Sequence, residues 1–542
     1  MSTNISKQKR EDLLNKIKAI RAFISAAPQD ENTGNLLSYL SDLEKDVNGK
    51  KYGLVFEEHR EEIDEVLDTH TPALTEEKDL FIDNGGQMNF LIEGDNLASL
   101  KLLEKTHKGK VDLIYIDPPY NRGKQDFIYD DNYIETEDTF KHSKWISFMR
   151  CRLNIAKRLM QKYACIFISC DDNEVASLRL LCDEIFGERN FQGHIHWRRR
   201  HNQPNDKTKL IALVTEHILV YSKDKDEHKK YGVGKVNVTG KFSNPDNDPR
   251  GPWASKPWKS GSNQSGCKYT IISPTGKRFD EEWLGDEATF YALKQDDRII
   301  FPKGGNGSPR KKYFQFEREE EGQCATNWWP NNLFGCNQDA TDELKAIFNG
   351  ICPFDNPKPT KLIKSIINLG FVGNHGVILD FFAGSGTTGD AVMQLNASGN
   401  KHSFILCTNN ENNICRDVTY ERIKRVIDKE GYAASLKYYK VEYVPISDRL
   451  YYEYADELLK HIRELVELEN GINFTGNAEI AIVLTEEELA DFVDQLDELP
   501  ECKKLYMGHD LLPTGEQEEA LQSHDIEINI IPDYYYRDLQ ER

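Results

Sequence analysis

Apolar residues recur with two different periods along this chain, and the changes of period divide it into blocks. From about residue 90 to 190 the pattern alternates between strand and helix. Continuous apolar runs at 111–116 and 164–169 are typical of buried strands. Between the two runs, large apolar side chains recur at helical spacing, at Trp145, Phe148, Met149, Leu153, Ala156 and Leu159. This block therefore predicts strands and helices in alternation.

The same alternation returns at 360–430, after a long interruption. Here the pattern predicts an amphipathic helix at 361–369, a strand at 377–382, a helix at 387–395 and a strand at 404–407. Strands that alternate with helices build parallel sheets. The two blocks together predict an α/β fold with a doubly wound, mostly parallel sheet.

The remaining segments differ in composition and in the spacing of their apolar residues. Residues 1 to about 70 carry apolar residues at helical spacing among charged ones, which predicts amphipathic helices. From 195 to 345 the chain is rich in Gly, Pro, Asn and Trp, which indicates an irregular insert. After 441, short apolar runs around a helical stretch predict a small β-α-β unit. We therefore divide the chain into a helical region (1–75), two α/β halves (76–190 and 350–440), the insert between them (191–349) and an acidic C-terminal domain (441–542).

Charge is distributed unevenly over these regions. The whole chain has 69 Lys and Arg against 90 Asp and Glu, a net charge of −21, which argues against a polybasic membrane binder. Residues 191–320 nevertheless contain 24 basic against 17 acidic residues, while 441–542 contain 7 against 26. The insert can therefore meet an anionic partner, and the acidic end is explained most simply by solubility.

Neither a membrane nor a metal is expected. No stretch approaches the roughly 18 apolar residues of a transmembrane helix, and the N-terminus lacks an apolar signal-peptide core, so we expect a soluble cytoplasmic protein. The 11 cysteines form no C-x-x-C pair, which favours reduced thiols over disulfides or a zinc site. The histidines of the insert also lack a metal-ligand spacing, at His194, His196, His201 and His217.

A glycine-rich turn, Asp-Phe-Phe-Ala-Gly-Ser-Gly-Thr-Thr-Gly at 380–389, follows a predicted strand. A phosphate-binding loop needs Lys after the last glycine, but Asp390 follows and would repel phosphate. The spacing also matches a dinucleotide fingerprint, although no acidic residue follows at the usual distance except Glu411, in a polar loop. A third possibility is an S-adenosylmethionine site, whose cofactor carries a sulfonium and no pyrophosphate. The segment favours this third interpretation and leaves a purely structural turn open.

The tetrapeptide Asp117-Pro118-Pro119-Tyr120 ends a strongly apolar strand, where ligands bind in open α/β sheets. It could be an ordinary strand-ending turn. Its chemistry also suits methylation of an exocyclic amino group on a nucleobase. Asp117 and the Pro118 carbonyl offer acceptors for the two N–H bonds, which localises the nitrogen lone pair, and Tyr120 offers an aromatic face for a base taken out of its helix.

Together the two motifs resemble the amino-methylating DNA methyltransferases, specifically β-class N6-adenine enzymes similar to type III restriction-modification Mod subunits. In that class the catalytic motif precedes the cofactor turn, as here, and a target-recognition domain lies between them. The resemblance covers about residues 85–430. It implies a Rossmann-like methyltransferase with permuted motif order, in which 76–190 is the catalytic half, 191–349 the target-recognition domain and 350–440 the cofactor half.

The resemblance also implies site residues. Catalysis would fall to Asp117, Pro118, Pro119 and Tyr120. Segments 94–97 and 354–359 resemble the family's further cofactor-contact motifs. S-adenosylmethionine would be bound by Asp95, Pro359, Asp380, Phe382, Ala383, Gly384, Ser385 and Gly386. The family usually ends its second cofactor strand with an acidic residue for the ribose hydroxyls; here Asn409 or Glu411 would take that place.

The resemblance further implies double-stranded DNA as substrate and a homodimer. It also implies association with a helicase-nuclease restriction subunit, because this chain shows no Walker A, helicase or nuclease motif of its own. Phosphate contacts are expected from Arg198, Arg199 and Arg200, although such a charge run can also be a solvated face. The alternatives are a DNA N4-cytosine or RNA adenine methyltransferase with the same site, a dinucleotide oxidoreductase, and a DNA-binding specificity subunit whose methyl transfer is vestigial.

Overall fold

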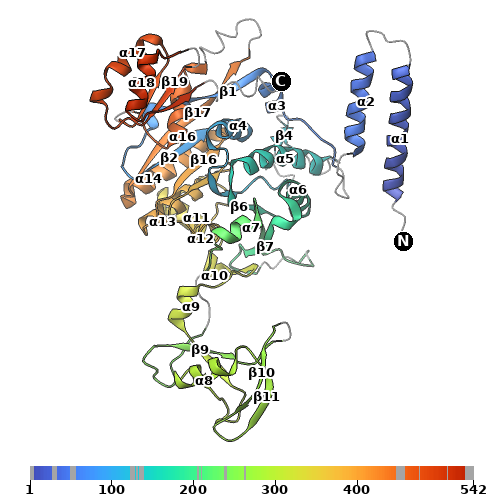
Figure 1. Ribbon diagram of the computed structural model, residues 1–542, viewed down its shortest axis with the longest axis vertical. Helices are drawn as coiled ribbons and strands as arrows, with labels where there is room; N and C mark the ends of the chain where they lie inside the picture. Colours follow the sequence, from blue (N-terminus) through green and yellow to red (C-terminus); the bar gives the residue numbers. More distant parts are fainter. Residues whose placement is uncertain are drawn as a thin grey trace.

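The computed structural model describes most of the chain, and Figure 1 shows three parts: a large α/β body, a small β-rich unit at one end and a helical pair at one side. The described residues are 5–26, 33–48, 56–122, 128–129, 132–133, 140–203, 207–208, 210–236, 241–261, 264–446, 458–474, 477–508 and 511–531. In these ranges no helix has the length and apolarity needed to cross a bilayer.

The body is built on one ten-stranded sheet, in the order β1-β17-β2-β16-β15-β3-β6-β8-β7-β14. The strands are β1 (His70–Glu76), β2 (Gln87–Glu93), β3 (Val111–Ile116), β6 (Met160–Cys170), β7 (Phe191–Arg198), β8 (Thr215–Ser222), β14 (Trp328–Trp329), β15 (Val377–Asp380), β16 (Ser403–Thr408) and β17 (Ala434–Pro445). Neighbours from β17 to β6 are all parallel, whereas β1 and β8 run antiparallel to the strands beside them. The predicted mostly parallel sheet is confirmed.

Helices cover both faces of this sheet. One face packs α4 (Asn96–His107), α5 (Lys141–Leu159), α6 (Val175–Cys182) and α16 (Ile462–Asn470), and the other packs α12 (Thr360–Gly370), α13 (Thr387–Ala397) and α14 (Glu421–Glu430). Successive side chains of β3 enter the two cores in turn: Ile114 and Ile116 one, Leu113 and Tyr115 the other. Burial on both faces is why this strand reads as a continuous apolar run.

The N-terminal helices are as predicted. α1 (Ile5–Ala26) and α2 (Thr33–Asn48) pack as a pair joined by an Arg21–Glu44 ion pair of 2.9 Å. α3 (Glu62–Thr69) follows and leads directly into β1. The region predicted as helical at 1–75 thus also supplies an edge strand of the central sheet.

The insert begins later than predicted. We expected the first α/β half to end at residue 190, but β7 and β8 belong to the central sheet, as does β14. β7 escapes prediction because its residues alternate between polar and apolar (Phe-Gln-Gly-His-Ile-His-Trp-Arg). After α7 (Lys225–Tyr231) the chain leaves the body at Val236 and returns at Gln323, where the two segments exchange backbone hydrogen bonds of 2.9 and 3.2 Å.

The part of the insert beyond this stem is a small folded unit. It contains a three-stranded sheet, a hairpin and two helices, namely β9 (Trp253–Pro257), β12 (Ile299–Ile300), β13 (Arg310–Phe314), β10 (Cys267–Ile272), β11 (Arg278–Trp283), α8 (Glu287–Gln295) and α9 (Gln315–Glu321). Trp258, Ile271, Trp283, Phe290 and Ile299 form its own core. Because it has a separate core, the unit projects from the body without sharing its packing (Figure 1). The shorter elements of the described chain are β4 (Ile128–Tyr129), β5 (Asn132–Tyr133), α10 (Asn331–Phe334) and α11 (Asn337–Ile347).

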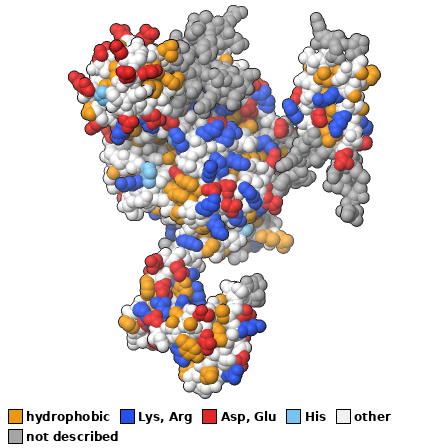
Figure 2. All heavy atoms as spheres, in the orientation of Figure 1, with side chains coloured by type: hydrophobic (Ala, Val, Ile, Leu, Met, Phe, Trp, Pro, Cys, Tyr) orange, Lys and Arg blue, Asp and Glu red, His pale blue; other side chains and the backbone are white. Residues whose placement is uncertain are grey.

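The C-terminal unit begins after α16, later than the predicted boundary at 441, since β17 and α16 pack in the body. It contains a parallel three-stranded sheet, β18 (Ile480–Val483), β19 (Lys504–Met507) and β20 (Glu527–Ile530), with α17 (Glu486–Asp494) and α18 (Gly515–Ser523). The predicted β-α-β order is confirmed. Figure 2 shows acidic side chains gathered over this unit and Lys and Arg side chains over the body.

Candidate active site

The carboxyl ends of neighbouring parallel strands bring the predicted motifs together. Asp117 follows β3, and Asp380 ends β15, the next strand of the sheet. Asp95 lies just beyond β2, which is separated from β15 by β16. Motifs that are far apart in the sequence therefore open at one edge of the sheet, which is where ligands bind in open α/β folds.

These strand ends surround a cavity of about 490 Å³. Small-molecule sites commonly measure roughly 300–1,000 Å³. The predicted residues that line it are Asp95, Asp117, Pro119, Asp380, Phe382, Ala383, Gly384, Ser385 and Glu411. Pro118, Tyr120, Pro359 and Gly386 are sequence neighbours of lining residues and are not on its wall.

Asp117 sits in a hydrogen-bond network that the sequence did not reveal. Its Oδ2 accepts from the Lys358 ammonium at 2.5 Å, and its Oδ1 accepts from the Tyr120 hydroxyl. Lys358 also lies 3.1 Å from the Tyr120 hydroxyl and 3.4 Å from Glu216. Trp145 donates to the Pro119 carbonyl at 2.7 Å, which fixes the Pro-Pro segment. A carboxylate at the strand end thus holds a primary amine at hydrogen-bond distance.

Burial and charge oppose each other at this amine. Lys358 is 7% exposed, and burial alone would lower the pKa of its ammonium; the carboxylates of Asp117 and Glu216 outweigh burial and raise it. Burial and the charge of Asp117 also raise the pKa of Tyr120 well above its usual value. Tyr120 is therefore a neutral hydroxyl donor. Its ring is buried, so the expected stacking on a base stays a prediction.

The glycine turn is held by hydrogen bonds from inside. Asp380 accepts from the Thr388 hydroxyl at 2.5 Å and from the Phe382 amide at 3.1 Å. Gly384 has φ +48°, and a Cβ there would lie 3.0 Å from the Phe354 ring. Burial raises the pKa of Asp380 to about 7, with the two hydrogen bonds acting in the opposite direction. The backbone therefore approaches the cavity where a side chain would fill it.

Arg422 braces the turn from behind. It is fully buried, pairs with Asp390 at 2.9 Å and donates to Thr387 Oγ1 at 2.8 Å. Asp390, whose charge argued against phosphate, is thus neutralised inside the protein. The sequence offered no sign of this pair, because its members lie on different helices, 32 residues apart.

Asp95 is fixed by its helix and by a buried arginine. It caps α4 by accepting from the Leu97 amide at 2.7 Å, and Arg152 lies 3.4 Å from its second oxygen. Arg152 pairs with Glu61 at 2.5 Å, and both line the cavity. Neither was predicted, since Glu61 lies in the N-terminal region and Arg152 in the middle of an amphipathic helix.

The remaining predicted residues are placed as follows. Asn409 and Glu411 both line the cavity and are joined by a hydrogen bond of 2.7 Å, so both stay candidates for binding hydroxyl groups. Pro359 precedes α12 and lies against Gly335. Arg199 pairs with Glu216 at 3.1 Å and is largely buried, whereas Arg200 is exposed. Both arginines line a second hollow, together with His201 and Gln338.

Sheet topology and site define a class: an α/β protein with a small-molecule cavity at the strand ends and an amine-holding carboxylate beside it. A family model described as DNA methylase matches residues 111–420, more than half of the chain. The chain belongs to this DNA methylase family.

Curated relatives are similar over the same region. The Mod subunit of the type III restriction-modification enzyme StyLTI, from Salmonella typhimurium, is 34% identical over 65% of this chain and 57% of its own. The EcoP15I Mod subunit from Escherichia coli is 31% identical over 60% of this chain and 59% of its own. The present chain thus spans under two thirds of these relatives. A DNA modification methylase from Thermus thermophilus, solved with S-adenosyl-L-methionine, is 15% identical over 65% of this chain and 99% of its own, with a TM-score of 0.32.

Proposed function

We propose that this protein is a site-specific DNA methyltransferase that transfers a methyl group from S-adenosylmethionine to N6 of an adenine flipped out of duplex DNA. One observation carries the proposal: in a chain of the DNA methylase family, Asp117 already holds an amine next to the glycine turn of the neighbouring strand. The adenine amino group offers the N–H donors that the Lys358 ammonium offers here.

The cavity fits the cofactor. Its volume suits a small molecule, and the glycine backbone leaves the space that a Cβ at Gly384 would take. Carboxylate or amide oxygens at Asp95, Asn409 and Glu411 can accept from hydroxyl and amino groups. When bound, S-adenosylmethionine supplies an electrophilic methyl group on a cationic sulfur. Phe382 and Phe354 supply apolar wall around it.

The residues around Asp117 have three roles in the proposed reaction. Lys358 must leave the carboxylate, so that the adenine amino group takes its place. Asp117 and the Pro118 carbonyl then accept hydrogen bonds from the two N–H groups of the adenine amine. These hydrogen bonds draw electron density onto N6. When the nitrogen bonds to the methyl carbon, the bond from this carbon to sulfur would break and leave a neutral thioether. The Asp117 carboxylate would stabilise the positive charge on the amine until N6 releases one proton to water.

We further propose that the protein is the modification subunit of a type III-like restriction-modification system. The similarity to two Mod subunits supports this, as does the order of the motifs. A homodimer and a separate helicase-nuclease subunit belong to the proposal. Exposed Arg200 and the basic insert would contact DNA phosphates. Work on cellular DNA requires the cytoplasmic location predicted from the sequence.

Modified-base sequencing of genomic DNA from cells with and without the gene tests this function. We expect N6-methyladenine at one strand-specific motif, present only with the gene and absent when the gene carries Asp117→Asn. N4-methylcytosine would identify the cytosine-specific alternative, and modification confined to RNA the adenine alternative. A biological effect that survives Asp117→Asn without any modified base would favour a DNA-binding specificity subunit.

A further inference from the structure

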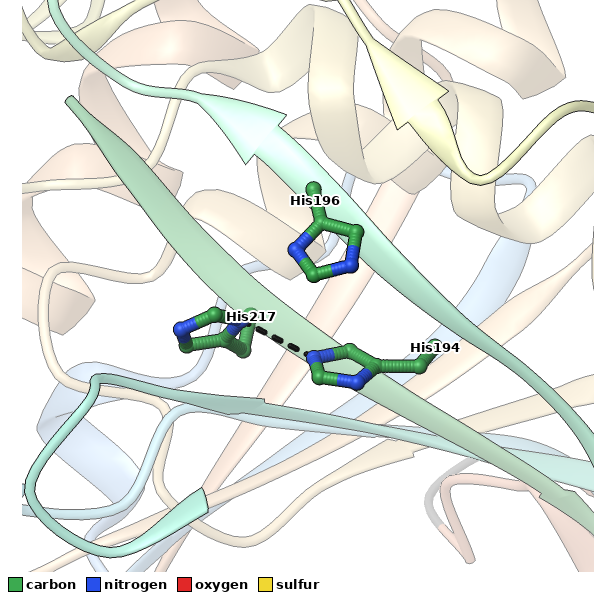
Figure 3. Close-up of side chains that lie close together, drawn as sticks. All are labelled: His194, His196 and His217. Atoms are coloured by element: carbon green, nitrogen blue, oxygen red, sulfur yellow. Dashed lines mark hydrogen bonds between the residues drawn. The ribbon is translucent and has the colours of Figure 1, made fainter. Parts of the chain in front are cut away.

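Three imidazole rings meet on one face of the β7-β8 pair, as Figure 3 shows. His194 and His196 are two residues apart on β7, so their side chains lie on the same face of the sheet. The antiparallel register places His217 of β8 directly opposite His196. One ring nitrogen from each histidine lies within 4.8 Å of the others. No metal-ligand spacing is visible in the sequence, because the third histidine arrives through strand pairing; His201, also considered, lies outside the cluster.

The hydrogen bonds of His217 orient its ring as a metal ligand. His217 Nε2 lies 2.9 Å from Asp172 Oδ1, in the turn after β6, and His217 Nδ1 lies 2.9 Å from His194 Nε2. A carboxylate acceptor makes Nε2 the N–H donor and leaves the lone pair of Nδ1 pointing into the cluster. A carboxylate behind a histidine is the usual way in which proteins fix and strengthen a metal-bound imidazole.

Metal binding requires neutral imidazole rings. His217 is buried and the other two are half-buried. Neutral imidazoles in contact have lone pairs that a cation can satisfy.

This cluster is separate from the candidate active site. Glu216 and His217 are consecutive on β8, so their side chains lie on opposite faces of the sheet. Glu216 meets Lys358 and Arg199 on the active-site face, whereas His217 meets Asp172 and His194. An ion bound here would not touch the reacting groups. It would join β7 to β8 just before the segment that carries Arg198, Arg199 and Arg200.

A cluster of three carboxylates in the insert differs from the histidine cluster because it already contains a cation. Asp246, Asp248 and Asp297 also cluster, but the Lys312 ammonium lies among them at 2.5, 3.1 and 3.3 Å. That group already has its cation and needs no metal.

We propose that His194, His196 and His217 bind a zinc ion, with Asp172 as the positioning residue and a fourth coordination place open to water. Three imidazoles with an open position suit Zn²⁺, whose Zn–N distances are about 2.0–2.1 Å. Small ring rotations close the cluster to these distances. The ion is a structural clamp on the sheet edge, and this inference does not depend on the proposed methyl transfer.

Metal analysis of the full chain, purified without a histidine tag, tests the site. After removal of metals with a chelator and dialysis against buffered Zn²⁺, we expect one ion per chain. The His194→Ala/His217→Ala variant loses it, and the control His524→Ala, an exposed histidine of the C-terminal unit, retains it. Asp172→Asn keeps all three ligands and weakens affinity roughly 10–100-fold.

Two further measurements keep the test decisive if the double variant folds poorly. Co²⁺ in place of Zn²⁺ reports its ligands: nitrogen ligands give visible bands without the thiolate charge-transfer band that cysteine would add. Zn²⁺ should also raise the melting temperature of the wild type and leave that of His196→Asn unchanged. Retention of the ion by the double variant, a thiolate band, or no bound ion in the wild type would each overturn the proposal.

Discussion

At the scale of single residues, the Asp117-Lys358-Glu216 network holds one cation between two carboxylates. Lys358 is nearly buried between two carboxylates and compensates both. Removing one partner of a buried ion pair commonly costs about 3–5 kcal/mol, because the remaining charge loses its compensation. The lysine therefore stabilises the free protein, and we propose that the substrate amine takes its place during the reaction.

Lys358→Met should lower the free energy of unfolding by about 3 kcal/mol, measured by urea denaturation. Adding Asp117→Asn removes the carboxylate that has lost its cation and should restore part of the loss. A double variant no more stable than Lys358→Met would show that Asp117 does not depend on this lysine.

The buried carboxyl of Asp380 should make stability depend on pH. Its pKa is about 7 in the folded chain, above its ordinary value of 3.8, so the folded state holds a proton that the unfolded state loses. Stability contributed by this group is complete below pH 4 and is lost as the pH rises to 7. Asp380→Asn does not titrate: its amide oxygen can still accept from the Phe382 amide, and its NH2 group can donate to the Thr388 hydroxyl. Its stability relative to the wild type should therefore rise by about 2–4 kcal/mol between pH 4 and 8. Thermal melts across this range measure the difference, and a pH-independent difference would refute it.

At the scale of elements, the sequence predicted the strands, helices and turns that depend on the local pattern of residues. Three features appear where expected: the buried strands around 111–116 and 377–382, the glycine turn, and the strands and helices of the small C-terminal unit. They could be predicted because strands buried on both faces and turns have recognisable patterns in consecutive residues. β7 was missed, since a strand with one polar face has no continuous apolar run. Arg152 with Glu61 and Arg422 with Asp390 were missed because their partners meet only through the fold.

The glycine turn gives a prediction for this scale. Gly384→Ala should weaken S-adenosylmethionine binding about tenfold, or 1.4 kcal/mol, because the new methyl group meets Phe354 at the cavity wall. Gly431→Ala is the matched control: it also has a positive φ, +66°, but no atom lies within 4 Å of the added carbon. Isothermal titration calorimetry compares the two. Equal losses of affinity would mean that backbone strain, not the cavity, explains the effect.

At the scale of the molecule, the insert is a separable unit on a paired stem. Its own core and the hydrogen bonds between Val236 and Gln323 mean that the body closes without it. The acidic C-terminal unit has a core of its own as well. We therefore propose that cofactor binding and DNA recognition belong to different parts of the chain.

Replacing residues 237–322 with a short Gly-Ser linker should leave S-adenosylmethionine affinity within about twofold of the wild type, since none of the cavity residues lies in the deleted range. Sequence-specific methylation should fall below detection, because the folded unit that we propose for target recognition is lost. Methylation that keeps its sequence preference without the insert would locate target recognition elsewhere.

The most direct test of the central claim is mass spectrometry of the nucleosides from duplex DNA incubated with the purified protein and methyl-labelled S-adenosylmethionine. We expect labelled N6-methyldeoxyadenosine with the wild type and a rate at least about 100-fold lower with Asp117→Asn, since an amide lacks the negative charge that the developing cation requires. Asp112→Asn, on the same strand but at its other end, should keep most of the activity. Unchanged labelling by Asp117→Asn, or label on cytosine, would contradict the account.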